Sequence, residues 1–264
     1  MYAADVEALV LLLGAFGATG ALWTLQARAR MREHEQRAKQ LATWLDADMQ
    51  VALALAKHAA SSRQQAFAPI HILYAVVQSD PVALAIRAVG GDPAAVDAAL
   101  DVALERVPPT GEAAPDPREG NKLLGAALGL ARAHGREMTV VDTLNQLVHT
   151  PLAAPLDAPP LSASGLLFQL VHGDVPPTAL AGETHVHVIL RNDDYTTQDL
   201  VVAILRDVFE LPAERAHAVM RQAHEHGRAV IGRYTSELAK TKIESARRRA
   251  RDYVSPLWLG VEVC

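Results

Sequence analysis

The chain of 264 residues has a single cysteine, Cys264, so the sequence excludes an internal disulfide and a cysteine-based zinc site. Aromatic residues make up only 5% of it and alanine is abundant, which favours helices packed through small contacts over an all-β fold. Its 25 basic and 30 acidic residues give a net charge of −5, so we expect no nucleic-acid partner. A chain of this length is expected to form two domains.

The sequence also lacks the motifs of common enzymes. It has no Gly-x-x-x-x-Gly-Lys-Ser/Thr run, and therefore no phosphate-binding loop and no ATPase engine. Histidines gather in the C-terminal part, but no cysteine and no clear pair at i, i+4 spacing supports a zinc site there. These histidines are His185, His187, His217, His224 and His226. We expect no enzyme activity, no metal and no cofactor.

One long apolar run is present, at Ala8–Leu25, and it contains no charged residue. As a helix it would span about 27 Å, close to the ~30 Å hydrocarbon core of a bilayer. Asp5 precedes it and arginines follow from Arg28 onward, which predicts a short N-terminus outside and all later residues in the cytoplasm. A cleaved signal peptide would need a basic residue before the run. The sequence predicts a single-pass anchor in the cytoplasmic membrane over residues 1–32, with an interfacial or buried helix as the alternative.

Residues 33–172 have the pattern of an all-α domain. Apolar residues at three- and four-residue spacing predict one continuous helix over residues 33–60. Pro69 opens a second helix, Gly90-Gly91 ends a third, and Asp92-Pro93 starts another. Residues 107–118 and 150–160 are Pro-rich connections, and residues 161–171 form a last apolar helix.

An internal repeat runs through this domain. Residues 66–73, AFAPIHIL, align with residues 137–144, EMTVVDTL, about 71 positions later. Each block follows a helix rich in alanine and leucine, over residues 51–60 in one case and 122–133 in the other. A repeat of this size means that each copy is half of one helical core.

Residues 173–183 form a linker to a C-terminal domain at 184–264. We expect strands at 185–191, 228–234 and 257–263, and helices at 198–209, 212–225 and 236–252. Thr196 followed by Asp199 has the spacing of a capping box, so the preceding loop should lead into a helix. Pro212 begins the second helix and Gly227 ends it. The expected fold is a small α+β layer of helices against an antiparallel sheet.

The loop after the first of these strands crowds Asn192, Asp193 and Asp194 together. An amide oxygen beside two carboxylates makes an acceptor-rich corner that suits a cation. An α-amino group is such a cation, with three N–H donors that need about three acceptors once removed from water. A solvated turn with a helix cap is the ordinary alternative for Asn-Asp-Asp before a helix.

A family resemblance bears on this choice. The segments VILRNDDYT at 188–196, AERAHAVM at 213–220, AHEHGRAVIGRYT at 223–235 and Pro256-Leu257 follow one another in the order found in ClpS, the adaptor that recognises bacterial N-degrons. The chain resembles ClpS from Val188 to its C-terminus. The resemblance implies that Asn192, Asp193 and His224 bind the α-amino group of a protein's first residue. It also implies an apolar pocket for that residue's side chain, lined by Thr196, Gln198, Val201, Met220, Ala223 and Leu257.

The same resemblance places chaperone docking at Glu237 and Lys242, for which a solvated helix face is the alternative. The sequence departs from the family at three positions: Thr197 replaces the usual proline, Gln198 a methionine that guards the pocket, and Ala223 a bulkier valine. These changes predict a roomier mouth that rejects N-terminal Ile and Val less strongly.

The segments HILYAVVQ at 71–78 and DTLNQLV at 142–148 resemble the repeated helical N-domain of Clp-family AAA+ chaperones. Its usual Glu-His pair is absent, because Ile70-His71 and Val141-Asp142 stand there. Together the resemblances imply a membrane-anchored adaptor that delivers proteins with bulky hydrophobic N-terminal residues to a ClpA- or ClpC-like chaperone. A non-degradative membrane scaffold that binds a Clp chaperone is the alternative. The linker would also allow the two soluble domains to bind each other.

Overall fold

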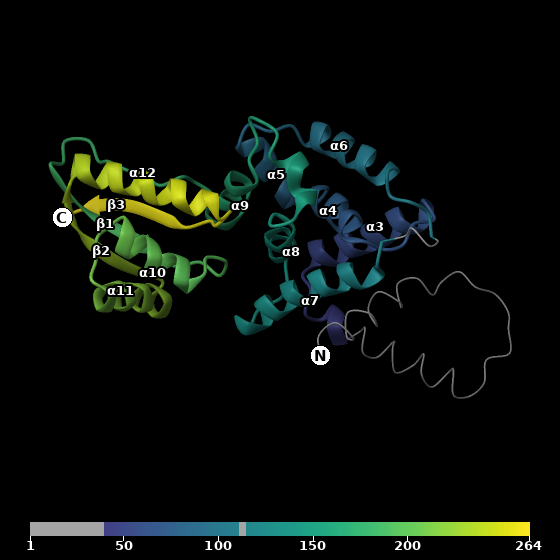
Figure 1. Cartoon of the computed structure of the whole chain (residues 1–264), viewed down its shortest axis with the longest axis horizontal. Coiled ribbons are helices and arrows are strands. Elements are labelled where there is room, and N and C mark those ends of the chain that lie inside the picture. The colour runs from purple at the N-terminus through teal and green to yellow at the C-terminus, as the bar shows by residue number, and fades with distance from the viewer. Residues whose placement is uncertain (1–39, 111–114) are drawn as a thin grey trace. The chain divides into compact units, whose positions relative to one another are not determined.

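The computed structural model describes residues 40–110 and 115–264. The chain divides into two compact units (Figure 1), a helical unit that ends at Leu161 and an adaptor unit, Ser162–Cys264. The boundary therefore lies before the last apolar helix, which we expected to close the helical domain. The expected anchor at Ala8–Leu25 lies outside the described residues.

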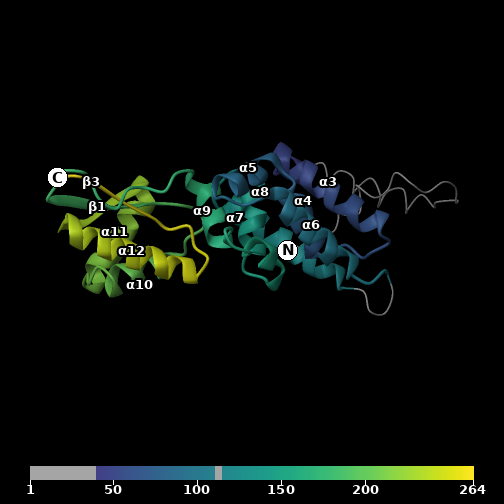
Figure 2. The same ribbon diagram turned by 90° about the horizontal axis from the view of Figure 1, so that it is seen from above.

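The helical unit contains six α-helices and one 3-10 helix within the described residues, and Figure 2 shows them from a second direction. They are α3 (Ala47–Ser62), α4 (Pro69–Val77), α5 (Asp80–Ala88), α6 (Pro93–Glu105), α7 (Pro117–Ala133), α8 (Val140–Leu147) and η2 (Pro151–Leu156). Helix α4 is buried on most of its surface and contacts α3, α6, α7 and α8. It is the centre of an apolar core that includes Met49, Leu73 and Leu144.

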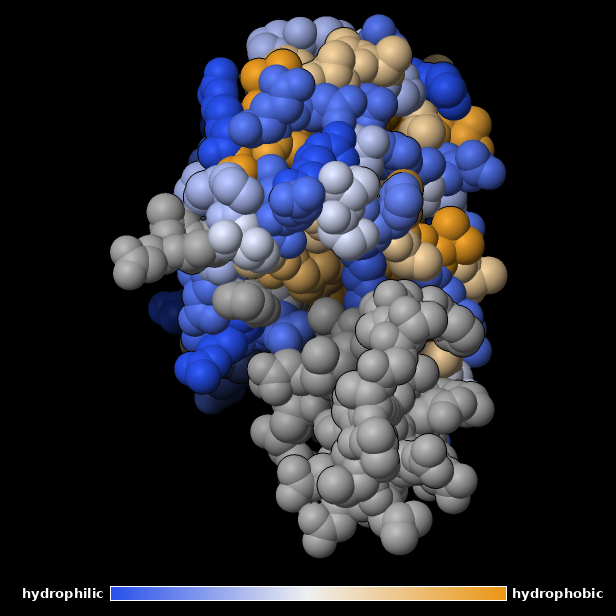
Figure 3. All heavy atoms as spheres, turned by 90° about the vertical axis from the view of Figure 1, so that its right-hand side faces the viewer, coloured by the Kyte–Doolittle hydropathy of each residue, from blue (hydrophilic) through white to orange (hydrophobic). Residues whose placement is uncertain are grey.

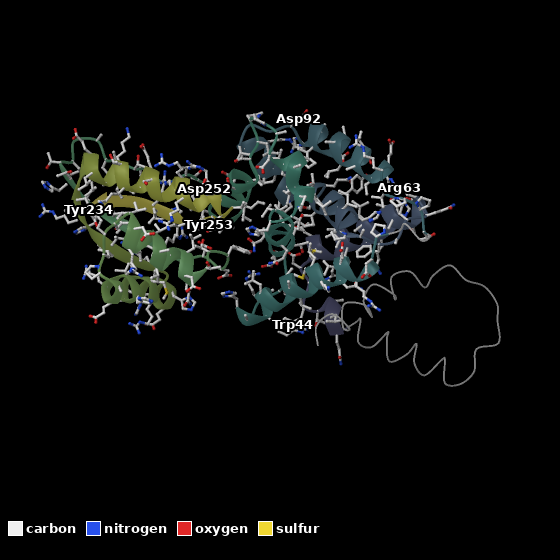
Figure 4. All side chains as sticks on the ribbon, viewed as in Figure 1. Trp44, Arg63, Asp92, Tyr234, Asp252 and Tyr253 are labelled. Carbon is white, nitrogen blue, oxygen red and sulfur yellow. The ribbon has the colours of Figure 1, made fainter. Side chains whose placement is uncertain are left out.

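The continuous helix predicted over residues 33–60 is wrong, because it is interrupted at residues 43–46. Asp46 caps α3 by accepting a hydrogen bond from the amide of Met49 at 2.7 Å. The backbone on either side of Leu45 pairs with Met138, whose N–H donates to Trp44 O at 2.7 Å and whose carbonyl accepts from Asp46 N at 3.1 Å. The guanidinium carbon of Arg132 on α7 lies 5.0 Å from the centroid of the Trp44 ring. Trp44 is labelled in Figure 4.

The two copies of the repeat share the same kind of side-chain capping interaction at the start of α4 and of α8. His71 and Asp142 are the third residues of these helices, and both are fully buried. Nδ1 of His71 accepts from the amide of Ala68 at 3.1 Å, and Oδ2 of Asp142 accepts from the amide of Thr139 at 2.8 Å. Each capping side chain therefore satisfies the backbone donor just before its helix.

A second residue in each copy then binds the capping side chain. In the first copy, Nε2 of His71 donates to Oε1 of Gln65 at 2.9 Å. In the second, the guanidinium of Arg136 donates to both oxygens of Asp142 at 2.7 and 2.8 Å. Both partners lie six residues before the capping residue, so the two copies share this hydrogen-bond arrangement as well as the sequence pattern.

The adaptor unit is a small α+β fold. Its elements are α9 (Ala163–His172), β1 (His185–Arg191), α10 (Gln198–Asp207), α11 (Ala213–His226), β2 (Arg228–Thr235), α12 (Ser236–Asp252) and β3 (Trp258–Val263). The sheet is antiparallel in the order β2-β1-β3, and Figure 1 shows α12 running along it. Val186, Val188 and Leu190 of the central strand belong to the core that α10, α11 and α12 share. The predicted elements agree with these bounds to within a residue or two.

The cap of α10 differs from the prediction. Thr197 caps this helix, accepting from the amide of Leu200 at 3.4 Å, whereas Thr196 was expected to do so. Thr196 is engaged elsewhere, because its amide and its hydroxyl both donate to Asp193. Gly227 ends α11 with a φ of 79°, the left-handed conformation that glycine adopts without strain.

Within the described residues, no single helix is long and apolar enough to cross a membrane. Helices α4 and α5, which meet at a bend of 71°, reach the length and apolar composition of a membrane span only when they are counted together. On the face shown in Figure 3, apolar residues lie scattered among hydrophilic ones. Scattered exposed apolar side chains are normal for a protein surface.

Candidate functional site

The acceptor-rich loop leaves the sheet at the end of β1 and is tied to the end of α11. Arg191 pairs with Arg228 in the sheet, and the amide of the next residue, Asn192, donates to Gly227 O at 2.9 Å. Gly227 directly follows α11, which carries His224 in its last turn. The backbone thus brings together the elements that bear Asn192 and His224.

The side chains of Asn192 and His224 make no hydrogen bond to any other described residue. His224 is exposed and Asn192 is half-buried. An amide oxygen and an unprotonated imidazole nitrogen are both acceptors. Two acceptors without protein partners, held beside one loop, suit a ligand that carries several N–H donors.

Asp193 plays a different part from its neighbours, because its side chain is 2% exposed and builds the loop. Its Oδ1 accepts from the amides of Tyr195 and Thr196 at 2.8 and 2.6 Å, and its Oδ2 accepts from the hydroxyl of Thr196 at 2.8 Å. Burial raises the pKa of the Asp193 carboxyl above its usual value, and these hydrogen bonds only partly oppose the rise. A carboxylate has about four lone-pair positions, so Asp193 retains acceptor capacity at Oδ2.

Two further residues reach this carboxylate, and the sequence pattern did not identify either. Ser255 lies 2.9 Å from the hydroxyl of Thr196, so it can donate to Thr196 while Thr196 donates to Asp193. His172, the last residue of α9, places Nε2 at 2.7 Å from Pro256 O and 4.0 Å from Oδ2 of Asp193. Nothing in the sequence around His172 marks it, because it simply ends an apolar helix before a linker.

The contact between His172 and Asp193 is not an ion pair. The His172 side chain is 3% exposed, and burial lowers the pKa of its imidazole more than the hydrogen bond to Pro256 and the charge of Asp193 raise it. Arg191 lowers that pKa further. The imidazole is therefore neutral at pH 7 and carries its proton on Nε2, where it donates to Pro256 O.

The residues predicted to line an apolar pocket gather in one core. Val201, Ala223 and Leu257 are buried in it, and Met220 packs against it while partly buried. Thr196 joins this group through Ser255, two residues before Leu257. Gln198 is the first residue of α10 and is exposed.

The predicted docking residues differ in availability. Glu237 is exposed in the first turn of α12. Lys242 is largely enclosed, with 13% of its side chain exposed, and its Nζ donates to Val208 O at 2.7 Å beside Glu210 at 3.6 Å. This ammonium binds the carbonyl at the C-terminal end of α10, where a cation stabilises a helix.

The part of the chain that the structure describes contains no group of three or more His, Cys, Asp or Glu side chains that could hold a metal ion.

Comparisons with known proteins match the two units separately. Residues 182–260 match the family described as the ATP-dependent Clp protease adaptor protein ClpS, and residues 45–144 match the Clp repeat N-terminal domain. The ClpS of Oleidesulfovibrio alaskensis is 45% identical over 75 residues, which are 28% of this chain and 72% of that protein. The ClpS of Vibrio cholerae is 39% identical over 85 residues, which are 32% of this chain and 80% of that protein.

A solved structure, Agrobacterium tumefaciens ClpS2 bound to L-phenylalaninamide, is 32% identical, with a TM-score of 0.29 over 30% of this chain and 95% of that one. The two family matches confirm the resemblances predicted for residues 184–264 and for the helical domain. With Clp repeat helices ahead of its adaptor unit, the chain belongs to the ClpS family of ATP-dependent Clp protease adaptors.

Proposed function

We propose that this adaptor is anchored in the membrane, binds the N-terminal residue of proteins and delivers them to a Clp AAA+ chaperone-protease. The observation that carries the proposal is the hydrogen bond from Asn192 N to Gly227 O, which holds the acceptor-rich loop against the end of α11. Asn192 and His224 then present two acceptors, and Oδ2 of Asp193 lies at the buried end of the loop. An ammonium group needs about three acceptors when it leaves water.

The predicted pocket residues indicate which N-terminal side chains the adaptor would accept. Val201, Ala223 and Leu257 belong to one buried apolar core, and Met220 packs against it while partly buried. A bulky hydrophobic first residue would bury its side chain there at about 25 cal/mol per Å². Recognition needs the amine and the side chain together, so an acetylated N-terminus should be rejected.

Binding of the full chain, kept in a mild detergent, to peptides that begin with Leu, Phe, Trp or acetyl-Leu tests the amine site. Fluorescence anisotropy should show binding of the free-amine peptides and none of acetyl-Leu. His224→Ala should abolish it, because an acceptor is lost. His226→Ala is the matched control, since His226 is also exposed at the end of α11 but bonds to Gln222 O. Equal binding of acetylated and free peptides would contradict the proposal and leave a scaffold role.

Delivery to the chaperone is tested by degradation of a Leu-headed reporter in the presence of a ClpA- or ClpC-like chaperone and its protease. Glu237→Lys should slow this degradation without changing peptide binding, because Glu237 is exposed on α12 and away from the loop. We expect Lys242→Ala to lower the stability of the adaptor unit as well, since its ammonium binds Val208 O. Peptide binding with no degradation in wild type would favour the scaffold.

The anchor and the binding of the two soluble domains to each other remain predictions. Retention of the chain in the membrane fraction after alkaline extraction, and its release when residues 1–32 are deleted, would support the anchor. A Clp repeat domain added in trans should bind more weakly to the full chain than to a variant without residues 45–144 if the two domains occupy each other.

A further inference from the structure

We propose that His172 is a positioning residue of the N-terminal-residue site, supplied by a helix that lies outside the segment matching the adaptor family. The inference rests on the proposed function of that site. The family match begins at residue 182, whereas α9 ends at His172. Helix α9 therefore lies ahead of the segment that matches the family model, and its last side chain comes within 4.0 Å of the Asp193 carboxylate.

His172 contacts both sides of the site. Its Nε2 donates to Pro256 O at 2.7 Å, and Pro256 directly precedes Leu257, a predicted pocket residue that lies in the buried core. The same nitrogen lies 4.0 Å from Oδ2 of Asp193, on the oxygen that the Thr196 hydroxyl also binds. One buried imidazole thus holds the segment before Leu257 by a hydrogen bond and packs beside the loop that carries Asp193.

The rest of α9 and the linker keep this imidazole in place. The ring of Phe168, one turn earlier, packs against the ring of His172 with centroids 4.9 Å apart. Further along, the guanidinium of Arg247 donates to Pro176 O at 2.7 Å and to Leu259 O at 2.6 Å, which attaches the linker to α12 and β3. The linker that we expected to separate two domains is thus bound to the adaptor unit at Pro176.

Replacing His172 should therefore act on the site through geometry. His172→Ala removes the donor to Pro256 O and exposes the carboxylate of Asp193, so both the pocket wall and the loop lose a fixed neighbour. We expect affinity for a Leu-headed peptide to fall about fivefold, the effect of one neutral buried hydrogen bond. His172→Gln retains an N–H donor and should restore most of the affinity at pH 7.5.

The pH dependence of peptide affinity distinguishes a positioning role of His172 from a role in packing alone. When His172 becomes protonated in acid, it places a cation beside Asp193 that competes with the ammonium of the peptide. The groups that face His172 are Asp193 and Arg191, and Arg191 keeps its charge throughout. Peptide affinity should therefore fall less steeply below pH 6.5 in His172→Gln than in wild type. His185→Gln, exposed at the start of β1, is the matched control.

The deciding experiment measures peptide affinity and amide hydrogen exchange in the same full-length variants. His172→Ala should weaken binding and speed exchange at Tyr195 and Thr196, whose amides bond to Asp193, about fivefold. Exchange that is unchanged at these two amides, with unchanged affinity and pH profile, would overturn the inference. If wild type binds no free-amine peptide, the proposed function fails, whereas the exchange result still decides whether His172 positions the loop.

Discussion

Within the described residues, Asp142 of the helical unit lies buried in the first turn of a helix, and Asp193 of the adaptor unit lies buried in the loop that leads into one. The two carboxylates differ in the partners that balance their charge. In the helical unit, Asp142 is bound by both nitrogens of the Arg136 guanidinium at 2.7 and 2.8 Å. In the adaptor unit, Asp193 receives three hydrogen bonds from neutral donors, and its only cation-forming neighbour among the described residues is the neutral His172 at 4.0 Å. Asp142 is neutralised within the fold, whereas Asp193 is not.

This difference has a physical consequence for function. A buried carboxylate without a full counter-charge has a raised pKa, as Asp193 does. An incoming ammonium would supply the missing charge and recover part of the desolvation energy. A complete internal ion pair indicates a structural group, and an incomplete one indicates a place where a cationic ligand gains affinity.

The largest expected effect comes from breaking the completed pair. Asp142→Ala leaves the amide of Thr139 without its acceptor and Arg136 without its partner, and should destabilise the helical unit by about 3 kcal/mol. Hydrogen exchange of α4 and α8 in the full chain measures it. Glu137→Ala, an exposed neighbour, should change little, and an equal loss in both variants would contradict the structural role of Asp142.

The corresponding change in the adaptor unit should act more on binding than on stability. Asp193→Asn keeps an acceptor for the amides of Tyr195 and Thr196 but removes the charge, so affinity for a Leu-headed peptide should fall about tenfold, or about 1.4 kcal/mol. Parallel titrations of peptide binding and of unfolding measure the two effects. A loss of stability equal to that of Asp142→Ala would remove the distinction between the two carboxylates.

Acid should affect the helical unit through His71. Burial lowers the pKa of His71, so the unfolded chain binds a proton at a higher pH than the folded unit does. The free energy of unfolding then decreases as the pH falls below the histidine pKa of the unfolded chain, about 6.5, with a slope of up to about 1.4 kcal/mol per pH unit. Unfolding of wild type and of His71→Gln between pH 7.5 and 5 measures it. The variant should have the shallower slope, and parallel curves would show that another group titrates.

The smallest effect concerns the side chain that the pocket accepts. Gln198 is exposed at the start of α10, where the family usually has a methionine that guards the pocket, and Ala223 stands in the buried wall. We expect wild type to bind Ile- and Val-headed peptides, and Gln198→Met to weaken that binding about fourfold, roughly the 0.8 kcal/mol of one buried methylene. Anisotropy with Leu-headed peptides as the reference measures the ratio. An unchanged ratio of Ile-headed to Leu-headed peptide affinity would show that Gln198 does not contact the bound side chain.

The sequence predicted the elements of the adaptor unit closely, since Pro212, Gly227 and the alternation along β1 are local signals. The amine site at Asn192, Asp193 and His224 came from the family resemblance and stays a prediction. Prediction from the sequence failed where a distant partner decides the local structure. The break at residues 43–46 depends on Met138, and the position of the His172 side chain depends on Pro256, and a local pattern reveals neither partner.

The pairing of Trp44 and Asp46 with Met138 bears on how the chain is synthesised. The first copy of the repeat is completed by the second, as in the contact of Met49 with Thr143, which are 94 residues apart. At about 5–20 residues per second, the ribosome needs roughly 5–20 s to supply the second partner. The first copy therefore leaves the ribosome with its apolar faces uncovered for that time, and a chaperone or the membrane surface has this interval in which to meet the nascent chain.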